Sequence, residues 1–93
     1  MVVYVDNALI KWTPPHMPHM TWRMSHMFSP DVEELHGFAL KLGLKRSWFQ
    51  CPPKASWLHY DLSATYRLKA LKLGAEPIEW RALPAKLREL GLR

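Results

Sequence analysis

The sequence predicts a small α/β (α+β) fold in which about three short strands form a mixed sheet packed with three helices in a single layer. Three patterns predict it: a β-branched run near the start, a segment of strict apolar and polar alternation, and helically spaced stretches that end in glycine. A chain of 93 residues has room for one hydrophobic core, so we expect a single domain over residues 1–93.

The first predicted strand covers residues 2–5, which are valines and a tyrosine with no polar residue among them. Such a run is typical of a strand buried on both faces. Asp6 follows it directly. Open α/β sheets bind ligands beyond the carboxyl ends of their strands, so Asp6 is a candidate base or metal ligand. The alternative is that Asp6 and Asn7 only form a turn that ends the strand.

The second predicted strand begins at Met20, after a proline-rich loop over residues 12–19. From Met20 onward apolar and polar residues alternate, so Trp22, Met24 and His26 share one face. This pattern predicts a half-buried strand with His26 on its apolar side. His26 is then either a core histidine with its hydrogen bonds satisfied or a group that points to a buried site.

Two helices are predicted in the middle of the chain. The first starts at residues 29–31, where Ser-Pro-Asp supplies an N-cap, a first-turn proline and a first-turn acid. The second is capped by Asp61 or Ser63. Each is predicted to end at a glycine, Gly43 or Gly74, because glycine readily adopts the left-handed conformation that follows a helix.

The remaining elements complete the order strand, strand, helix, helix, strand, helix. Residues 45–57 contain a Pro-Pro pair and are predicted to be a connecting loop. Residues 75–80 form a short strand candidate, which Pro77 restricts to an edge or to a strand start. A terminal helix follows, with Pro84 near its first turn and leucines at helical spacing from Leu83 onward.

Composition and charge narrow the classes of protein that this chain can belong to. Hydrophobic residues make up 48% and charged residues 23%, and no apolar run approaches the ~20 residues that cross a bilayer. No export signal is visible and one cysteine excludes an internal disulfide, so we expect a soluble, cytoplasmic protein. The net charge of +5 favours polyanionic partners, unless it serves solubility alone.

The step His59-Tyr60-Asp61 combines an imidazole, a phenol and a carboxylate just before a predicted helix N-terminus. Backbone N–H groups and the helix dipole favour anions there, so Ser63 and Arg67 are candidate phosphate-binding residues. The alternative is that Asp61 caps the helix while Tyr60 packs in the core.

Imidazole and carboxylate side chains together suggest a divalent metal ion such as Mn²⁺, Fe²⁺ or Zn²⁺. The candidate metal ligands are Asp6, His26, His59 and Asp61, with His36 at the border of the same cleft. Asp6, His59 and Asp61 are also the candidate catalytic residues. The sequence has no HExxH, no CxxC and no glycine-rich phosphate loop, so the hypothesis depends on tertiary convergence.

Basic residues and tryptophans suggest a second kind of site. The candidate nucleic-acid-binding residues are Lys45, Arg46, Lys54, Lys69 and Lys72. Tryptophan rings beside them could stack on bases, although in so short a chain tryptophans serve first of all as core residues.

Short motifs spread over residues 2–80 point to a family. They are Tyr4-Val5-Asp6-Asn7, Ser25-His26-Met27, Glu34-Leu35-His36, Gly43-Leu44, Trp48-Phe49-Gln50, His59-Tyr60-Asp61-Leu62-Ser63, Arg67, and Lys72-Leu73-Gly74-Ala75. In this order the chain resembles the small bacterial and phage proteins known as domain of unknown function 4031. The resemblance implies that the candidate polar residues, His36 and Arg67 included, fall at recurring polar positions, and it carries over no catalytic role. Tyr66 departs from an expected lysine, and residues 13–19 form a longer stretch, which places His16 and His19 outside a shared site.

Three functions follow as hypotheses. The first is a metal-assisted phosphoesterase or nuclease, which requires Asp6, His26, His59 and Asp61 to converge within ~2.0–2.2 Å of one point. The second is a non-catalytic binder of nucleic acid or of a nucleotide, whose affinity would fall steeply with salt. The third is a phage-type accessory protein that binds and modulates a host protein in the host cytoplasm. The sequence leaves open whether the protein is an enzyme.

Overall fold

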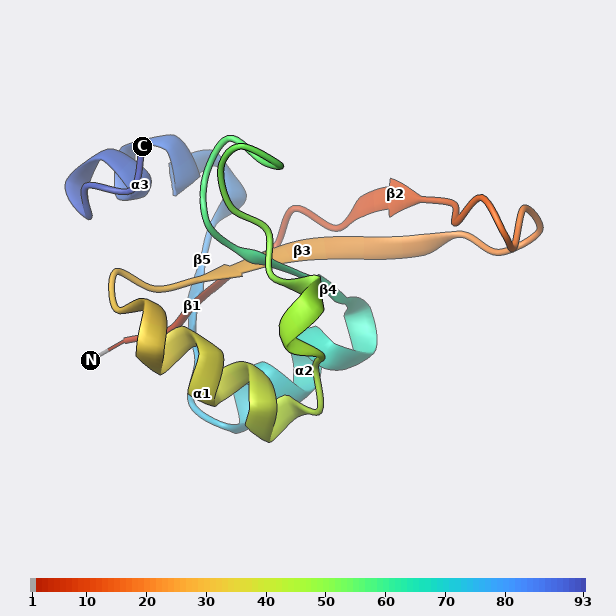
Figure 1. The fold of residues 1–93 in the computed structure, drawn as a ribbon, viewed down its shortest axis with the longest axis horizontal. Helices are drawn as coiled ribbons and strands as arrows, with labels where there is room; N and C mark the ends of the chain where they lie inside the picture. The colour runs from red at the N-terminus through yellow and green to blue at the C-terminus, as the bar shows by residue number, and fades with distance from the viewer. Residues whose placement is uncertain (1) are drawn as a thin grey trace.

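The computed structural model describes residues 2–93 (Figure 1). Within them the strands are β1 (Tyr4–Asp6), β2 (Ile10–Trp12), β3 (Trp22–Phe28), β4 (Tyr60–Ser63) and β5 (Glu76–Ile78). The helices are α1 (Val32–Leu42), α2 (Ala64–Lys72) and α3 (Leu83–Glu89), with single 3₁₀ turns at Arg46–Trp48 and Trp80–Ala82. The predicted mixed α/β class is confirmed. The count of about three strands is wrong. No strand was predicted at β2, whose Trp12 was placed in a loop, and β4 was predicted as the approach to a helix.

Strand β3 organises the sheet because it pairs along both of its edges. Met24 lies between Ile10 of β2 and Ser63 of β4, and both of these strands run antiparallel to β3. Met27 lies in the same way between β1 and β4, so β1 and β2 share the edge of β3 opposite β4. Strand β5 adds to β1 in parallel and forms an edge, as Pro77 predicted.

A bulge separates β1 from β2. The two strands pair with β3 in registers that differ by two residues, so residues 6–9 lie opposite residues 25–26 only. Leu9 adopts a positive φ of 50° within this segment. Extra residues of this kind bend a strand and re-aim its side chains. Here the extra residues begin at Asp6, directly after the last paired residue of β1 in its ladder with β3.

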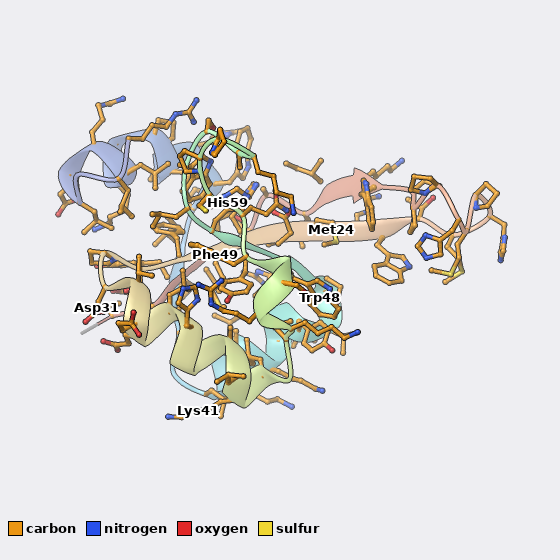
Figure 2. All side chains as sticks on the ribbon, in the orientation of Figure 1. Met24, Asp31, Lys41, Trp48, Phe49 and His59 are labelled. Carbon is orange, nitrogen blue, oxygen red and sulfur yellow. The ribbon has the colours of Figure 1, made fainter. Side chains whose placement is uncertain are left out.

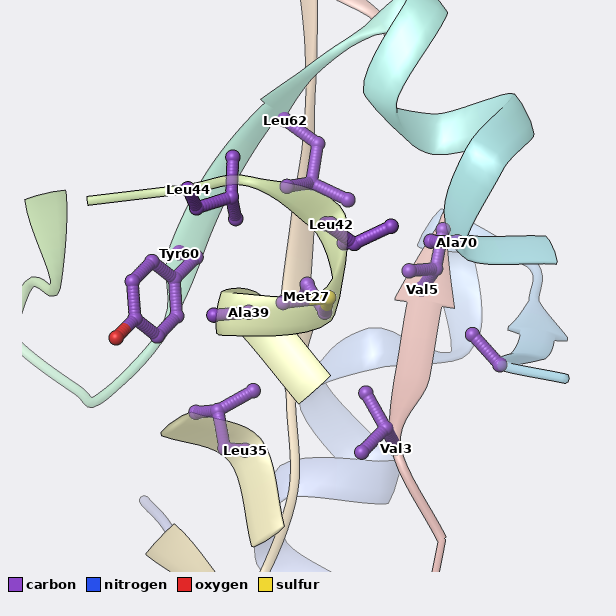
Figure 3. Packing of buried hydrophobic residues seen from close by; sticks show 11 residues of the cluster. Val3, Val5, Met27, Leu35, Ala39, Leu42, Leu44, Tyr60, Leu62 and Ala70 are labelled. Carbon is purple, nitrogen blue, oxygen red and sulfur yellow. The ribbon is translucent and has the colours of Figure 1, made fainter. Parts of the chain in front are cut away.

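One face of the sheet carries the main hydrophobic core. Val5, Met27 and Leu62 are fully buried there and pack against α1 and α2 (Figure 3). Helix α1 contributes Leu35 and Ala39, which are four residues apart and therefore lie on one side of the helix. This core joins strands β1, β3 and β4 to helices α1 and α2.

The opposite face carries a second, smaller cluster. Phe28 and Tyr4 point there because neighbouring residues of a strand alternate between faces, and their rings stack with centroids 5.4 Å apart. Trp57 and Leu87 of α3 complete the cluster. Helix α3 therefore lies on the side of the sheet away from α1 and α2 (Figure 1), and the predicted single layer of helices is wrong.

The structure corrects two local predictions and decides between the alternatives of a third. Asp31, and not Ser29, is the N-cap of α1, and its carboxylate accepts the N–H of Glu34 at 3.2 Å. Of the two predicted N-caps of α2, Ser63 is the one that caps the helix, so this prediction is confirmed in one of its alternatives. His26 does not face the main core. Its strand alternates as predicted, but the buried partners of the core lie at the intervening positions, such as Met27.

Candidate functional site

Strand pairing brings three of the candidate residues together. His26 of β3 lies directly opposite Asp61 of β4, and directly opposed residues of an antiparallel pair point to the same face. His59 is two residues before Asp61 and shares that face, whereas Tyr60 between them points into the main core. Figure 2 shows His59 on the side of β3 away from α1. The alternation of side chains along the strand therefore places His59 and Asp61 in the site and directs Tyr60 away from it.

The three side chains converge on a small volume. His59 Nε2 lies 3.4 Å from Asp61 Oδ1, and His26 Nε2 lies 4.0 Å from the same oxygen. One ligand atom from each residue lies within 4.8 Å of the other two. Ligands held at ~2.0–2.2 Å from one ion in tetrahedral directions are about 3.4 Å apart. Small side-chain movements would therefore place all three around a single divalent ion.

Both histidines have their Nδ1 atoms occupied by acceptors. His26 Nδ1 lies 2.6 Å from Asp6 Oδ2, and His59 Nδ1 lies 3.0 Å from the backbone oxygen of Trp57. A carboxylate and a carbonyl can only accept, so each Nδ1 carries a proton, and Nε2 is the ring atom that can bind a metal ion once it is deprotonated. Metal-binding histidines are oriented by the same kind of outer partner.

Asp6 lies behind His26 and does not join the converging group. Its carboxylate is completely buried and accepts three hydrogen bonds, from the His26 ring, from the His26 backbone N–H at 2.9 Å and from that of Ala8 at 3.1 Å. Burial raises the pKa of Asp6, but the hydrogen bonds and positive charge of His26 lower it by more. The pKa of Asp6 is therefore below its ordinary value. Asp6 is therefore an ionised acceptor that orients His26.

The same charges act on the other two groups. Burial lowers the pKa of His26, but the hydrogen bond to Asp6 and the two carboxylates of Asp6 and Asp61 raise it above its ordinary value. Burial raises the pKa of Asp61, but bonds from His59 and Gln50 and the charge of His26 lower it overall. Because His26 holds its proton more firmly than usual, a metal ion would compete with that proton at Nε2.

Two residues of the site, Gln50 and Trp57, were not among the candidate site residues predicted from the sequence. Gln50 donates from Nε2 to Asp61 Oδ2 at 2.6 Å, and its backbone exchanges two 2.9 Å hydrogen bonds with His59. Trp57 is buried and stacks on the His59 ring with centroids 4.3 Å apart. Both come from the segment predicted as a plain connecting loop. Its motif Trp48-Phe49-Gln50 was visible, but only folding brings it to β4.

The other candidate residues take different positions. His36 lies outside the group: its Nδ1 is 2.8 Å from the hydroxyl oxygen of Tyr60, and its ring packs on Phe49. Arg67 donates from Nε to the backbone oxygen of Asp6 at 2.9 Å and so ties α2 to the end of β1. Ser63 caps α2 at the border of the site.

The candidate basic residues come from different elements, and Lys69 sits over the ring of Tyr66. Lys54 lies near the group, in the lining of a groove described below. Lys45 and Arg46 are exposed and sit over the rings of Trp48 and Phe49. Lys69 and Lys72 are exposed on α2.

The group opens into a groove of about 730 Å³. His26, Gln50 and Asp61 are among its lining residues, and the side chains of His26 and Asp61 are 20% and 34% exposed. Trp22 and Met24 line it as well, because they share the face of β3 that carries His26. The alternation that the sequence presented as a core face is thus the wall of an open groove.

One comparison with known proteins finds a match. A family model described as "Protein of unknown function (DUF4031)" matches residues 3–90 of the 93. No curated protein and no solved structure matches the chain. Across residues 2–93, no helix combines the length and the apolar character needed to cross a membrane.

Proposed function

The chain belongs to the DUF4031 family, and we propose that it is a metal-dependent phosphoesterase in which His26, His59 and Asp61 hold one divalent ion. One observation carries the proposal. The ligand atoms of these three side chains lie within 4.8 Å of one another, and both imidazoles have Nδ1 engaged so that Nε2 is left to bind.

The ligand set favours a catalytic ion over a structural one. Two imidazoles and one carboxylate suit Zn²⁺, Mn²⁺ or Fe²⁺, whereas structural zinc sites close the shell with four protein ligands. Asp6 and Gln50 supply the outer hydrogen bonds, to His26 and to Asp61. Three protein ligands leave room for a water molecule and a substrate oxygen.

The chemistry follows from these positions. A divalent ion bound by His26, His59 and Asp61 would lower the pKa of its water, to about 7 in the case of Zn²⁺, and would supply hydroxide near neutral pH. Asp6 keeps His26 in the tautomer that binds through Nε2. That hydroxide would form the new P–O bond as the ester P–O bond breaks, and the leaving oxygen would take up a proton from water. Lys54 in the groove lining and the net charge of +5 favour an anionic substrate.

The test begins with metal binding. Metal-free protein titrated with Zn²⁺ or Mn²⁺ in a calorimeter should bind one equivalent, and His59→Ala and Asp61→Asn should abolish binding. His19→Ala is the matched control, because His19 is exposed in the loop between β2 and β3, away from the group. Unchanged binding in both ligand variants contradicts the proposed site.

Turnover is measured with the same variants. Wild-type protein loaded with metal should hydrolyse a simple phosphodiester such as bis-(p-nitrophenyl) phosphate, and chelation should stop it. His19→Ala should retain the rate, and His59→Ala should lose it. A metal-bound wild-type protein that turns over no phosphoester would contradict the proposed reaction while leaving the metal site in place.

A further inference from the structure

We infer that the groove beside the metal-ligand group binds a single strand of nucleic acid. The binding itself rests on the groove, and only the strand's role as substrate rests on the proposed function. The inference names the occupant of a groove whose volume, about 730 Å³, falls in the range of natural ligand sites.

Three tryptophans line the groove without belonging to either hydrophobic cluster. Trp12 and Trp48 are 45% and 43% exposed, and Trp22 meets Trp12 edge to face with ring centroids 6.1 Å apart. None of the three belongs to the clusters that hold the fold together. Tryptophan left open on a concave surface is a platform on which bases stack, whatever their sequence.

Strand β2 is the clearest case of this unused apolar surface. All three of its residues are exposed, and Ile10 reaches 54% exposure on the same wall as Trp12. Leaving such a patch open to water forgoes hydrophobic stabilisation, and patches of this kind mark binding surfaces. The side chains of β2 are available to a ligand because they are exposed, and within the described residues the strand pairs only with β3.

The charge of the lining points to a polyanion. Lys11 and Lys54 both line the groove, and Lys45 sits over the Trp48 ring at 5.8 Å. Among the lining residues of the described chain, Asp61 is the only carboxylate, and it belongs to the metal-ligand group. Lysines beside stacking surfaces match a strand that alternates phosphates with bases.

The position of the tryptophans selects a single strand over a duplex. Bases in a duplex are stacked on each other and paired, so they cannot lie on rings inside a groove. In a single strand the bases are free to stack on Trp12 or Trp48. A phosphate of the same strand can then reach His26 and Asp61, which open into the groove.

Binding is tested by quenching of tryptophan fluorescence in metal-free protein, with chelator present. The probes are a short single-stranded DNA, its RNA counterpart, the corresponding DNA duplex and inorganic phosphate. Single strands should bind with an affinity that falls as salt rises, and the duplex and phosphate should bind far more weakly. The DNA and RNA arms tell which strand is preferred. No binding of either single strand overturns the inference and leaves the groove to a protein partner.

Variants locate the binding surface. Trp12→Ala and Trp48→Ala should each weaken single-strand binding roughly five- to a hundredfold, while Trp48→Phe should recover most of it. Trp80→Ala is the control, because Trp80 is 48% exposed but does not line the groove. Circular dichroism checks that the variants fold. Wild-type affinity in both groove variants would overturn the inference.

The two proposals fail in different ways. His59→Ala should still bind the strand, since His59 does not line the groove, and should not cleave it. If wild-type protein binds the strand but does not cleave it with any divalent metal ion present, the proposed function is contradicted and the inferred binding in the groove stands. If the protein hydrolyses a small phosphodiester but binds no single strand, the inferred binding is contradicted and the proposed function stands.

Discussion

Asp6 holds both the ring and the backbone of His26. Its Oδ2 lies 2.6 Å from His26 Nδ1, and its Oδ1 accepts the His26 backbone N–H at 2.9 Å. The bulge after β1 makes this possible, because the regular pairing of β1 with β3 ends before Asp6, and the Asp6 carboxylate accepts the His26 N–H in place of a backbone oxygen. The orientation of His26 therefore depends on one buried carboxylate.

Asp6→Asn should weaken metal binding about ten- to a hundredfold without unfolding the protein. Asparagine has nearly the same shape but lacks the charge that holds the His26 tautomer, and outer-shell changes have effects of this size. Calorimetric titration measures the loss. Asp31→Asn is the matched control, because Asn caps α1 as well as Asp does. Equal losses in the two variants would show that the effect is not specific to Asp6.

Two substitutions of Gln50 should separate orientation from charge. Gln50→Ala removes the 2.6 Å hydrogen bond to Asp61 and should reduce metal affinity about tenfold. Gln50→Glu places a second carboxylate beside Asp61, so it should destabilise the metal-free protein and be stabilised more by added metal. Thermal melts with and without metal measure both effects. A wild-type response to metal in both variants would remove Gln50 from the site.

The metal-free protein should be most stable between about pH 4 and pH 6.5. The pKa of His26 is raised from 6.5, so its contribution is complete below 6.5 and is lost as the pH rises through the raised value. The pKa values of Asp6 and Asp61 are lowered from 3.8, so their contributions are complete above 3.8 and are lost as the pH falls through the lowered values.

Urea unfolding at a series of pH values, with chelator present, measures this profile. Asp6→Asn should flatten its alkaline side, because His26 then loses its main partner. Asp31→Asn should keep the wild-type steepness on the alkaline side, because the Asp31 carboxylate accepts the Glu34 N–H and not a bond from His26. An alkaline side of unchanged steepness in Asp6→Asn would show that the pair does not control the pH dependence.

Leu62→Ala should lower the free energy of unfolding by about 2–5 kcal/mol. Leu62 is fully buried in the main core, and its truncation leaves a cavity between β4 and the helices. Leu40→Ala is the control, because Leu40 is 69% exposed on α1 and should change the free energy by less than about 0.5 kcal/mol. Urea titrations measure the free energy of unfolding of both variants. Similar losses in the two would show that Leu62 is not a residue of the main core.

Local patterns predicted the elements whose signals are local. The run before Asp6, the alternation through His26 and the glycine after α1 each depend on near neighbours, and β1, β3 and α1 follow from them. Gly43 ends α1 with a φ of +89°, as its position predicted. Strands β2 and β4 were missed because they are short and form only by pairing with β3.

The sequence by itself determined the α/β class, the family and the residue types from which a polar site could be built. Tertiary structure decided which of them meet: β4 extends as a strand, so His59 and Asp61 turn to His26 while Tyr60 turns away. It also placed Asp6 behind His26 and brought Gln50 from a distant loop. The physical reason is that strand pairing is a long-range interaction, and the face to which a side chain points depends on a partner strand.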